Sequence, residues 1–260
     1  MNIETVGVTD RPRLSIEIEC VAQHAPWQSI FLHLLPGALF SLTFAMLSPW
    51  LREQHLPPLW AFLIPLLLVL IPCEAGILLY LSYQRNGRFS LDGIVLNRTP
   101  LQKKDIPLVL ILFVWSSSIF VLGGNLDGVM FDRLFNWLPD WFMMDQYVLT
   151  ETSQGIRLGT FIMFLLLNGV AGPIVEELYF RGFLLPHIEY MKGWAPVVNI
   201  VLFSLYHFFS PWQNLTRILA FLPMALAVRW KKKIHLSMLA HCLLNLGFCL
   251  MSAPLFFSVG

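Results

Sequence analysis

Long apolar stretches constrain this chain most strongly. A membrane-crossing helix needs about 20 predominantly apolar residues, and seven stretches approach that length. The chain is 57% hydrophobic and only 13% charged, with a mean hydropathy of +0.66, whereas an ordinary soluble domain carries about 25% charged residues. We therefore predict an all-α, polytopic transmembrane helix bundle. The expected spans are Trp27–Trp50, Leu59–Tyr83, Pro107–Gly123, Leu158–Leu185, Ala195–Phe209, Leu215–Val228 and Leu236–Phe257.

The charges of the loops decide between seven and eight spans. Basic residues gather in the loop 84–106 and again in 229–233. Basic loops stay on the cytoplasmic side of a membrane, so seven spans with a cytoplasmic amino terminus place both of these loops inside. A break at Gly172-Pro173 would add an eighth crossing and put the second loop outside. We therefore expect one long, kinked helix through that step.

The chain divides into three regions. Residues 1–27 are polar and lack the pattern of a cleavable signal, so the first apolar run is expected to be a retained span. Residues 28–156 hold three spans, a basic cytoplasmic loop and an external amphipathic loop near 127–147. Residues 157–260 form a core that carries the polar motifs. No basic, aromatic-interleaved patch indicates a nucleic-acid partner.

Two adjacent carboxylates and an arginine interrupt the fourth apolar stretch. Each ionised side chain costs roughly 2.5–3.5 kcal/mol at the centre of a membrane helix. Glu177 and Arg181 are one helical turn apart and can pair. Glu176 points about 100° away from Glu177 around the helix, so its carboxylate is left for another role. This pattern indicates a reactive centre within the membrane.

Two further motifs place histidines in later spans. Phe203 and His207 are one turn apart, as are His241 and Asn245. A lone membrane histidine more often bonds between helices than catalyses. Two histidines, an amide and an acid pair in the final hundred residues together suggest a hydrolytic site. Their depths differ along the expected spans, so short or tilted helices would have to bring them together.

The three motifs, in this order and each on an apolar helix, resemble the CPBP family, which contains CAAX proteases and bacteriocin-processing enzymes and is also called the Abi or Rce1-like family. The resemblance covers about Leu158 to Leu250. It implies an intramembrane endopeptidase. Glu176 would be the general base that activates water and His207 would assist it. His241 and Asn245 would hold water or stabilise the oxyanion.

The remaining motif residues have supporting roles in this interpretation. Glu177, Arg181 and Phe203 would be structural or tuning partners. No cofactor is certain. A zinc ion would need three protein ligands and an open position, which Glu176, His207 and His241 could supply, but the chain has no HExxH motif. Metal-dependent and metal-free mechanisms therefore both stay open.

Glu74 is a second intramembrane acid, in the second span. It could belong to the site, pair with a buried histidine such as His33, or serve the structure near Pro72. The sequence leaves these alternatives open.

The expected substrate is a membrane-associated peptide or protein, prenylated or bacteriocin-like, and the lipid bilayer is the other expected partner. The expected location is a bacterial inner membrane, crossed several times. One alternative is a non-catalytic immunity or scaffold protein of the same fold. A proton-coupled transporter is less favoured, because transporters usually show two related halves and this sequence shows none.

Overall fold

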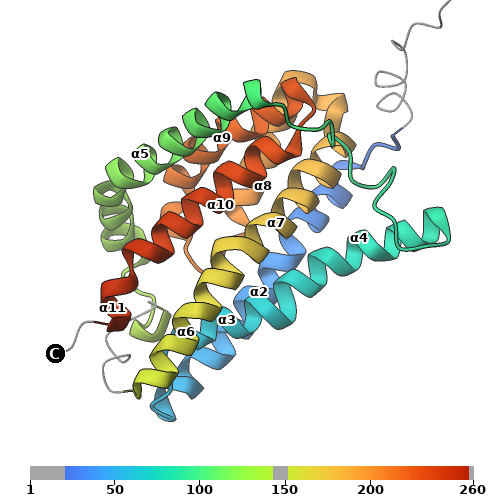
Figure 1. The fold of residues 1–260 in the computed structure, drawn as a ribbon. Helices are drawn as coiled ribbons and strands as arrows, with labels where there is room; N and C mark the ends of the chain where they lie inside the picture. The colour runs from blue at the N-terminus through green and yellow to red at the C-terminus, as the bar shows by residue number, and fades with distance from the viewer. Residues whose placement is uncertain (1–20, 143–151, 258–260) are drawn as a thin grey trace, which may run out of the picture.

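The computed structural model describes residues 21–142 and 152–257, and those residues form an all-α bundle (Figure 1). The predicted all-α class is confirmed. The amino-terminal half contains α2 (Pro26–Glu53), α3 (Trp60–Pro65), η1 (Leu66–Leu70), α4 (Ile71–Asn86), η2 (Lys103–Asp105), α5 (Ile106–Met130), η3 (Phe131–Phe135) and η4 (Asp140–Phe142). The segments α3, η1 and α4 follow one another without a break, and α4 ends at Gly87, whose positive φ of 64° suits a residue without a Cβ.

The carboxyl-terminal half contains α6 (Gln154–Leu166), η6 (Leu167–Ala171), α7 (Gly172–Glu176), η7 (Glu177–Leu184), η8 (Leu185–Trp194), α8 (Ala195–Leu205), η9 (Pro211–Gln213), α9 (Asn214–Lys231), α10 (Ile234–Met251) and α11 (Ala253–Phe257). The chain stays helical through Gly172-Pro173, as one continuous helix requires. The turns on either side, η6 and η7, are π-helical. Pro173 has no backbone N–H to donate, and such wide turns often occur at functional sites.

The chain reverses direction within η8. Ile188 and Lys192 leave helical geometry there, with φ/ψ of −117°/20° and 53°/−123°. As a result α8 runs back beside η7, and Tyr206 at its end reaches Glu176. An ion pair of 2.6 Å between Arg229 Nη2 and Glu189 Oε1 ties η8 to α9.

Among the described residues, five helical stretches are long and apolar enough to cross a membrane, judged by length and composition; the seven or eight spans predicted are not shown. They are Pro26–Glu53, Trp60–Asn86, Lys103–Phe135, Gln154–Leu205 and Ile234–Phe257. The stretch Gln154–Leu205 contains both the predicted fourth and the predicted fifth span, and the reversal of the chain at Ile188 and Lys192 within η8 separates them. The predicted sixth span lies in α9, which carries Arg217, Arg229 and Lys231. Several such helices in one chain make this a multi-pass membrane protein.

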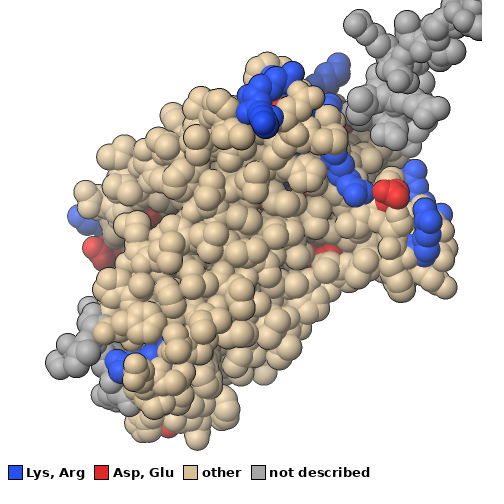
Figure 2. Space-filling view, viewed as in Figure 1, with Lys and Arg blue, Asp and Glu red and all other residues tan. Residues whose placement is uncertain are grey.

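The two basic loops lie at the same end of the bundle. Lys233 Nζ contacts Asp105 Oδ2 at 2.6 Å, and the backbone N–H of Thr99 donates to the Lys232 carbonyl. Figure 2 shows the Lys and Arg side chains gathered toward the ends of the molecule, and the region between them is almost free of charged side chains. The positive-inside argument requires this shared placement of the two loops.

Close packing fixes the elements around the acid pair. A Cβ on Gly37 would lie 1.9 Å from the Tyr206 carbonyl oxygen, so α2 rests directly on the backbone at Tyr206. Helix α10 packs along η6, α7 and η7, and α4 packs against α7 and η7. The acid pair therefore lies where α4, α7, η7, α10 and the end of α8 meet.

Candidate active site

Glu177 is held by partners from two helices. Its carboxylate lies 3.4 Å from Arg181 Nε, and both side chains are fully buried. Ser237 Oγ donates to Glu177 Oε2 at 2.5 Å, and His241 Nδ1 lies 3.1 Å from Glu177 Oε1. The pairing expected one turn apart is therefore present, and α10 contributes two more partners. These contacts stabilise Glu177 as a buried carboxylate.

Arg181 is stabilised by aromatic rings as well as by its ion pair. Its guanidinium carbon lies 4.1 Å from the centroid of the Phe203 ring. The three guanidinium nitrogens are buried and make no hydrogen bond within the described part of the chain. A desolvated cation over an aromatic face is favourable by about 2 kcal/mol. The Phe203 ring therefore stabilises the buried Arg181 cation.

Glu176 has a different environment. One oxygen, Oε1, accepts a hydrogen bond of 2.8 Å from the Tyr206 hydroxyl. The other, Oε2, lies 3.8 Å from His241 Nε2, which is too long for a direct hydrogen bond. The imidazole of His241 thus lies between the two acids, near Glu177 on one side and facing Glu176 on the other. Glu176 keeps one oxygen able to accept a proton.

His207 lies beside the Tyr206 ring. Its Nδ1 is 2.8 Å from the Phe203 carbonyl oxygen, so Nδ1 carries the proton and donates it. In the neutral ring, Nε2 then holds a lone pair. The His207 ring meets the Tyr206 ring edge-on, with centroids 4.6 Å apart. His207 therefore packs against the aromatic ring whose hydroxyl binds Glu176.

Asn245 follows His241 by one turn of α10. Its side-chain amide donates to the Asn168 carbonyl oxygen at 2.9 Å, which ties α10 to η6. The structure thus brings Glu176, Glu177, Arg181, Phe203 and His241 together and places His207 at their edge. The hydrogen bond described for Asn245 leads to η6 and not to the acids. The expected difference in depth disappears because α8 is short and ends beside Glu176.

The proposed zinc ligands do not converge. In the two described ranges, 21–142 and 152–257, no group of three or more His, Cys, Asp or Glu side chains is placed to hold a metal ion. Both nitrogens of His241 face carboxylates, and the Nδ1 of His207 is bonded to a carbonyl. Glu176, His207 and His241 therefore do not fit a three-ligand zinc site as arranged.

Two polar members of the cluster escaped the sequence analysis. Tyr206 binds Glu176, and it directly precedes His207 in the chain. Ser237 binds Glu177 and lies one turn before His241. The series 237, 241 and 245 at a spacing of four could have revealed Ser237. Tyr206 carried no comparable signal, because its partner is 30 residues away.

Glu74 joins this cluster and does not pair with His33. Its side chain is 1% exposed and lies near Tyr206 and the Glu176 carboxylate. His33 is held instead by the Ser29 carbonyl through Nδ1, at 2.7 Å, and by the Asn199 amide through Nε2, at 3.1 Å. Of the three alternatives, the structure therefore supports the one that places Glu74 beside the acid pair.

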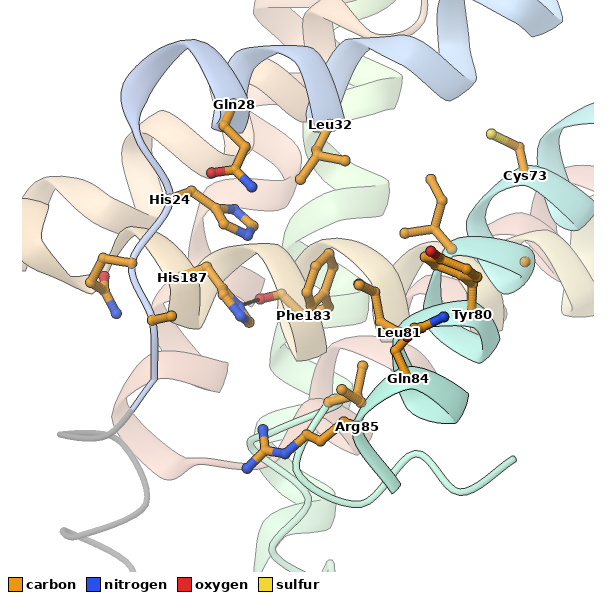
Figure 3. Close-up of a pocket in the computed structure, with 15 residues that line it drawn as sticks. His24, Gln28, Leu32, Cys73, Tyr80, Leu81, Gln84, Arg85, Phe183 and His187 are labelled. Atoms are coloured by element: carbon orange, nitrogen blue, oxygen red, sulfur yellow. Dashed lines mark hydrogen bonds between the residues drawn. The ribbon is translucent and has the colours of Figure 1, made fainter. Parts of the chain in front are cut away.

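A pocket of about 890 Å³ lies beside this cluster, between the start of α2, α4 and η7–η8 (Figure 3). Cys73, the residue before Glu74, lies at one end. His24 and His187 lie at the other end with their rings stacked 4.4 Å apart. The predicted site residues are not among its lining residues in the described chain. The pocket thus approaches the cluster from the α4 side without exposing it.

One comparison with known proteins gave a match. Residues 158–247 match the family model described as "Type II CAAX prenyl endopeptidase Rce1-like". No curated protein and no solved structure gives a significant match to the chain. The matched segment begins in α6 and ends in α10, and it includes all three motifs. The predicted family resemblance is confirmed over this segment.

Proposed function

We propose that this protein is an intramembrane endopeptidase in which Glu176 activates a water molecule. The observation that carries the proposal is the asymmetry of the Glu176 carboxylate. One oxygen is fixed by the Tyr206 hydroxyl, while the other faces His241 Nε2 across 3.8 Å. A general base needs a positioned oxygen that is free to accept a proton. Polar groups at this separation are commonly bridged by water.

Each group of the cluster has a role in the proposed reaction. Glu176 takes a proton from water, and the resulting hydroxide oxygen attacks the carbonyl carbon of the scissile peptide bond. His207 assists, and His241 and Asn245 hold the water or stabilise the oxyanion. When the C–N bond breaks, the leaving amine takes the proton from Glu176. Glu177 and Arg181 form the buried ion pair that fixes the electrostatic environment of this step.

The family match supports a peptidase and suggests the class of substrate. We propose membrane-associated peptides or proteins, prenylated or bacteriocin-like. The pocket between α2 and α4 offers mainly apolar side chains beside the cluster, which suits a segment arriving from lipid. We place the amino terminus and both basic loops on the cytoplasmic face of a bacterial inner membrane.

The test is cleavage of a farnesylated CAAX-type peptide by the purified full-length protein in lipid nanodiscs. Loss of a general base lowers rates by about 10²–10⁴-fold, so Glu176→Gln should remove nearly all cleavage, and His207→Ala should also impair it severely. Glu189→Gln, which changes a glutamate outside the cluster, is the matched control and should cleave normally. Full activity of Glu176→Gln would remove the general-base assignment.

If the wild-type protein leaves this peptide intact, the substrate is sought by proteomics. Membranes of cells with the wild-type protein are compared with membranes of cells with Glu176→Gln, and substrates should accumulate only in the variant. A cellular effect that survives both Glu176→Gln and His207→Ala would instead favour the non-catalytic alternative.

A further inference from the structure

Glu74 is a buried acid whose role the proposed mechanism does not require. It lies in α4, its side chain is 1% exposed, and neither carboxylate oxygen has a hydrogen-bond partner among the described residues. An ionised carboxylate buried without partners is strongly unfavourable. An acid kept in a membrane helix under these conditions is a functional candidate. The groups that surround it indicate which function.

Glu74 faces the open side of the acid pair. The Glu176 carboxylate and the Tyr206 hydroxyl both act on it electrostatically across the α4–α7 contact. The other titratable or charged groups close enough to act on it are Cys73, Glu177, Tyr179 and Arg181. Of these, Arg181 is already paired with Glu177 and stacked on Phe203. The positive charge of Arg181 therefore compensates Glu177 first and does less to stabilise an ionised Glu74.

Two neighbouring carboxylates in a low dielectric do not both ionise, because their repulsion adds to the unfavourable burial of each charge. A single proton shared by the pair resolves the conflict. Tyr206 has the right chemistry to connect them, since a phenol can donate one hydrogen bond and accept another. Its hydroxyl already donates to Glu176 Oε1 at 2.8 Å, and its oxygen remains able to accept a hydrogen bond.

We propose that Glu74 and Glu176 share one proton through Tyr206, with Glu74 protonated and Glu176 ionised in the resting site. The Glu74 O–H donates to the Tyr206 oxygen, and the Tyr206 O–H donates to Glu176. Glu74 is thus a positioning residue that keeps the base ionised and oriented. When Glu176 takes a proton from water, the pair holds two protons, and one leaves with the amine. This inference rests on the proposed role of Glu176.

Infrared difference spectroscopy of the full-length protein in nanodiscs at neutral pH tests the proton directly. Wild type minus Glu74→Gln should show a protonated-carboxyl C=O band that the variant lacks. Tyr206→Phe should shift this band, because Glu74 loses its hydrogen-bond acceptor, and Glu176→Gln should also shift it. Glu189→Gln is the matched control and should leave it unchanged. A spectrum identical in wild type and Glu74→Gln would overturn the inference.

Kinetics with the farnesylated peptide supply a readout that a structural role would not move. Glutamine imitates the protonated acid but cannot titrate. Glu74→Gln should therefore cleave with less than the roughly hundredfold loss expected for a missing base, and its pH–rate profile should lose the alkaline limb that marks ionisation of the shared proton. Glu74→Asp, which still titrates, should restore that limb. A profile unchanged in Glu74→Gln would show that the two acids do not share a proton.

The infrared and kinetic experiments together distinguish a failure of this inference from a failure of the proposed function. If the Glu74 band is present and responds to Tyr206→Phe and Glu176→Gln, while the farnesylated peptide is not cleaved and proteomics finds no substrate that accumulates in Glu176→Gln, the shared proton stands and the peptidase proposal fails. If cleavage depends on Glu176 but the band is absent, the peptidase proposal stands and the role of Glu74 is overturned. Should Glu74→Gln fail to fold, the Tyr206→Phe spectrum decides, because that variant leaves Glu74 in place.

Discussion

The two adjacent glutamates occupy opposite kinds of environment. Glu177 has a cation, a hydroxyl and an imidazole within 3.4 Å. Glu176 has one hydrogen bond from Tyr206 and faces a second, unpartnered acid in Glu74. Hydrogen bonds and opposite charges fix a carboxylate in its ionised form, whereas a sparsely partnered one can exchange protons. The comparison teaches that Glu177 is held by three partners, whereas Glu176 keeps one carboxylate oxygen without a direct hydrogen bond among the described residues.

The helix itself produces this division. Successive residues point about 100° apart, so adjacent acids face different neighbours. Glu177 turns toward α10 and Glu176 toward the end of α8 and toward α4. Glu177 also begins the π-helical stretch η7, which changes the spacing of the side chains that follow. If the proposed function is correct, substitutions around Glu177 should change mainly stability and substitutions around Glu176 should change mainly catalysis.

Removing the cation from the Glu177 side should have the largest effect on stability. Breaking one partner of a buried ion pair costs about 3–5 kcal/mol, so Arg181→Met should sharply lower the temperature of unfolding in detergent. The double variant Glu177→Gln/Arg181→Met should recover part of the loss, because no uncompensated charge remains. Lys231→Met, which removes a cation at the end of α9, is the control. An Arg181→Met protein as stable as wild type would contradict the structural role.

Removing the hydroxyl from the Glu176 side should act on catalysis more than on stability. A hydrogen bond to a charged group contributes about 1.5–3 kcal/mol, so Tyr206→Phe should lower kcat by about ten- to a hundredfold. The ring and its packing on Phe203 and His207 are retained. Steady-state cleavage and thermal unfolding, measured on the same preparation, separate the two effects. A loss of stability with normal kcat would show that Tyr206 has a structural role and not a catalytic one.

Ser237→Ala should have a smaller effect, and this effect should fall on stability and not on catalysis. The hydroxyl binds Glu177 Oε2 at 2.5 Å, but Glu177 keeps Arg181 and His241 as partners. We expect a loss of about 1 kcal/mol in the free energy of unfolding and little change in kcat. Ser252→Ala, at the far end of α10, is a matched control for the loss of a buried hydroxyl. A large loss of cleavage in Ser237→Ala would place Glu177 in the reaction itself.

The smallest expected effect lies outside the cluster. Burial, with repulsion from His187 as the lesser cause, lowers the pKa of His24 from 6.5 to about 4. The folded protein therefore keeps His24 neutral, and its contribution to stability is complete above pH 6.5 and is lost progressively toward pH 4. Acidification over this range should lower the unfolding temperature less in His24→Phe than in wild type. An equal decrease in both proteins would assign the pH dependence to other groups.

The pairs spaced by one turn were the most predictable part of the site. Glu177 and Arg181 could be paired from the sequence, since residues four apart share a helix face whatever surrounds them. The number of spans was less predictable. Apolar length alone does not show that the chain reverses within η8, or that Arg217 in α9 is buried and donates hydrogen bonds to Ser210 and Gln213.

The contacts that distinguish the two acids depend on residues far apart in the chain. Residues 74, 176 and 206 come from three segments that meet only after η8 reverses and α4 packs on α7. No spacing in the sequence records such a meeting. The zinc set illustrates the same limit, since Glu176, His207 and His241 have suitable chemistry but do not converge on one point.

The sequence by itself determined that the chain is a membrane-embedded helical protein with a buried acid pair, because burial in lipid and helical spacing act on local stretches of chain. Only the tertiary structure decided which acid is fully partnered and which retains a free oxygen. Ionisation inside a bundle depends on the charges and donors that neighbouring helices bring within a few ångströms, and those neighbours are set by packing.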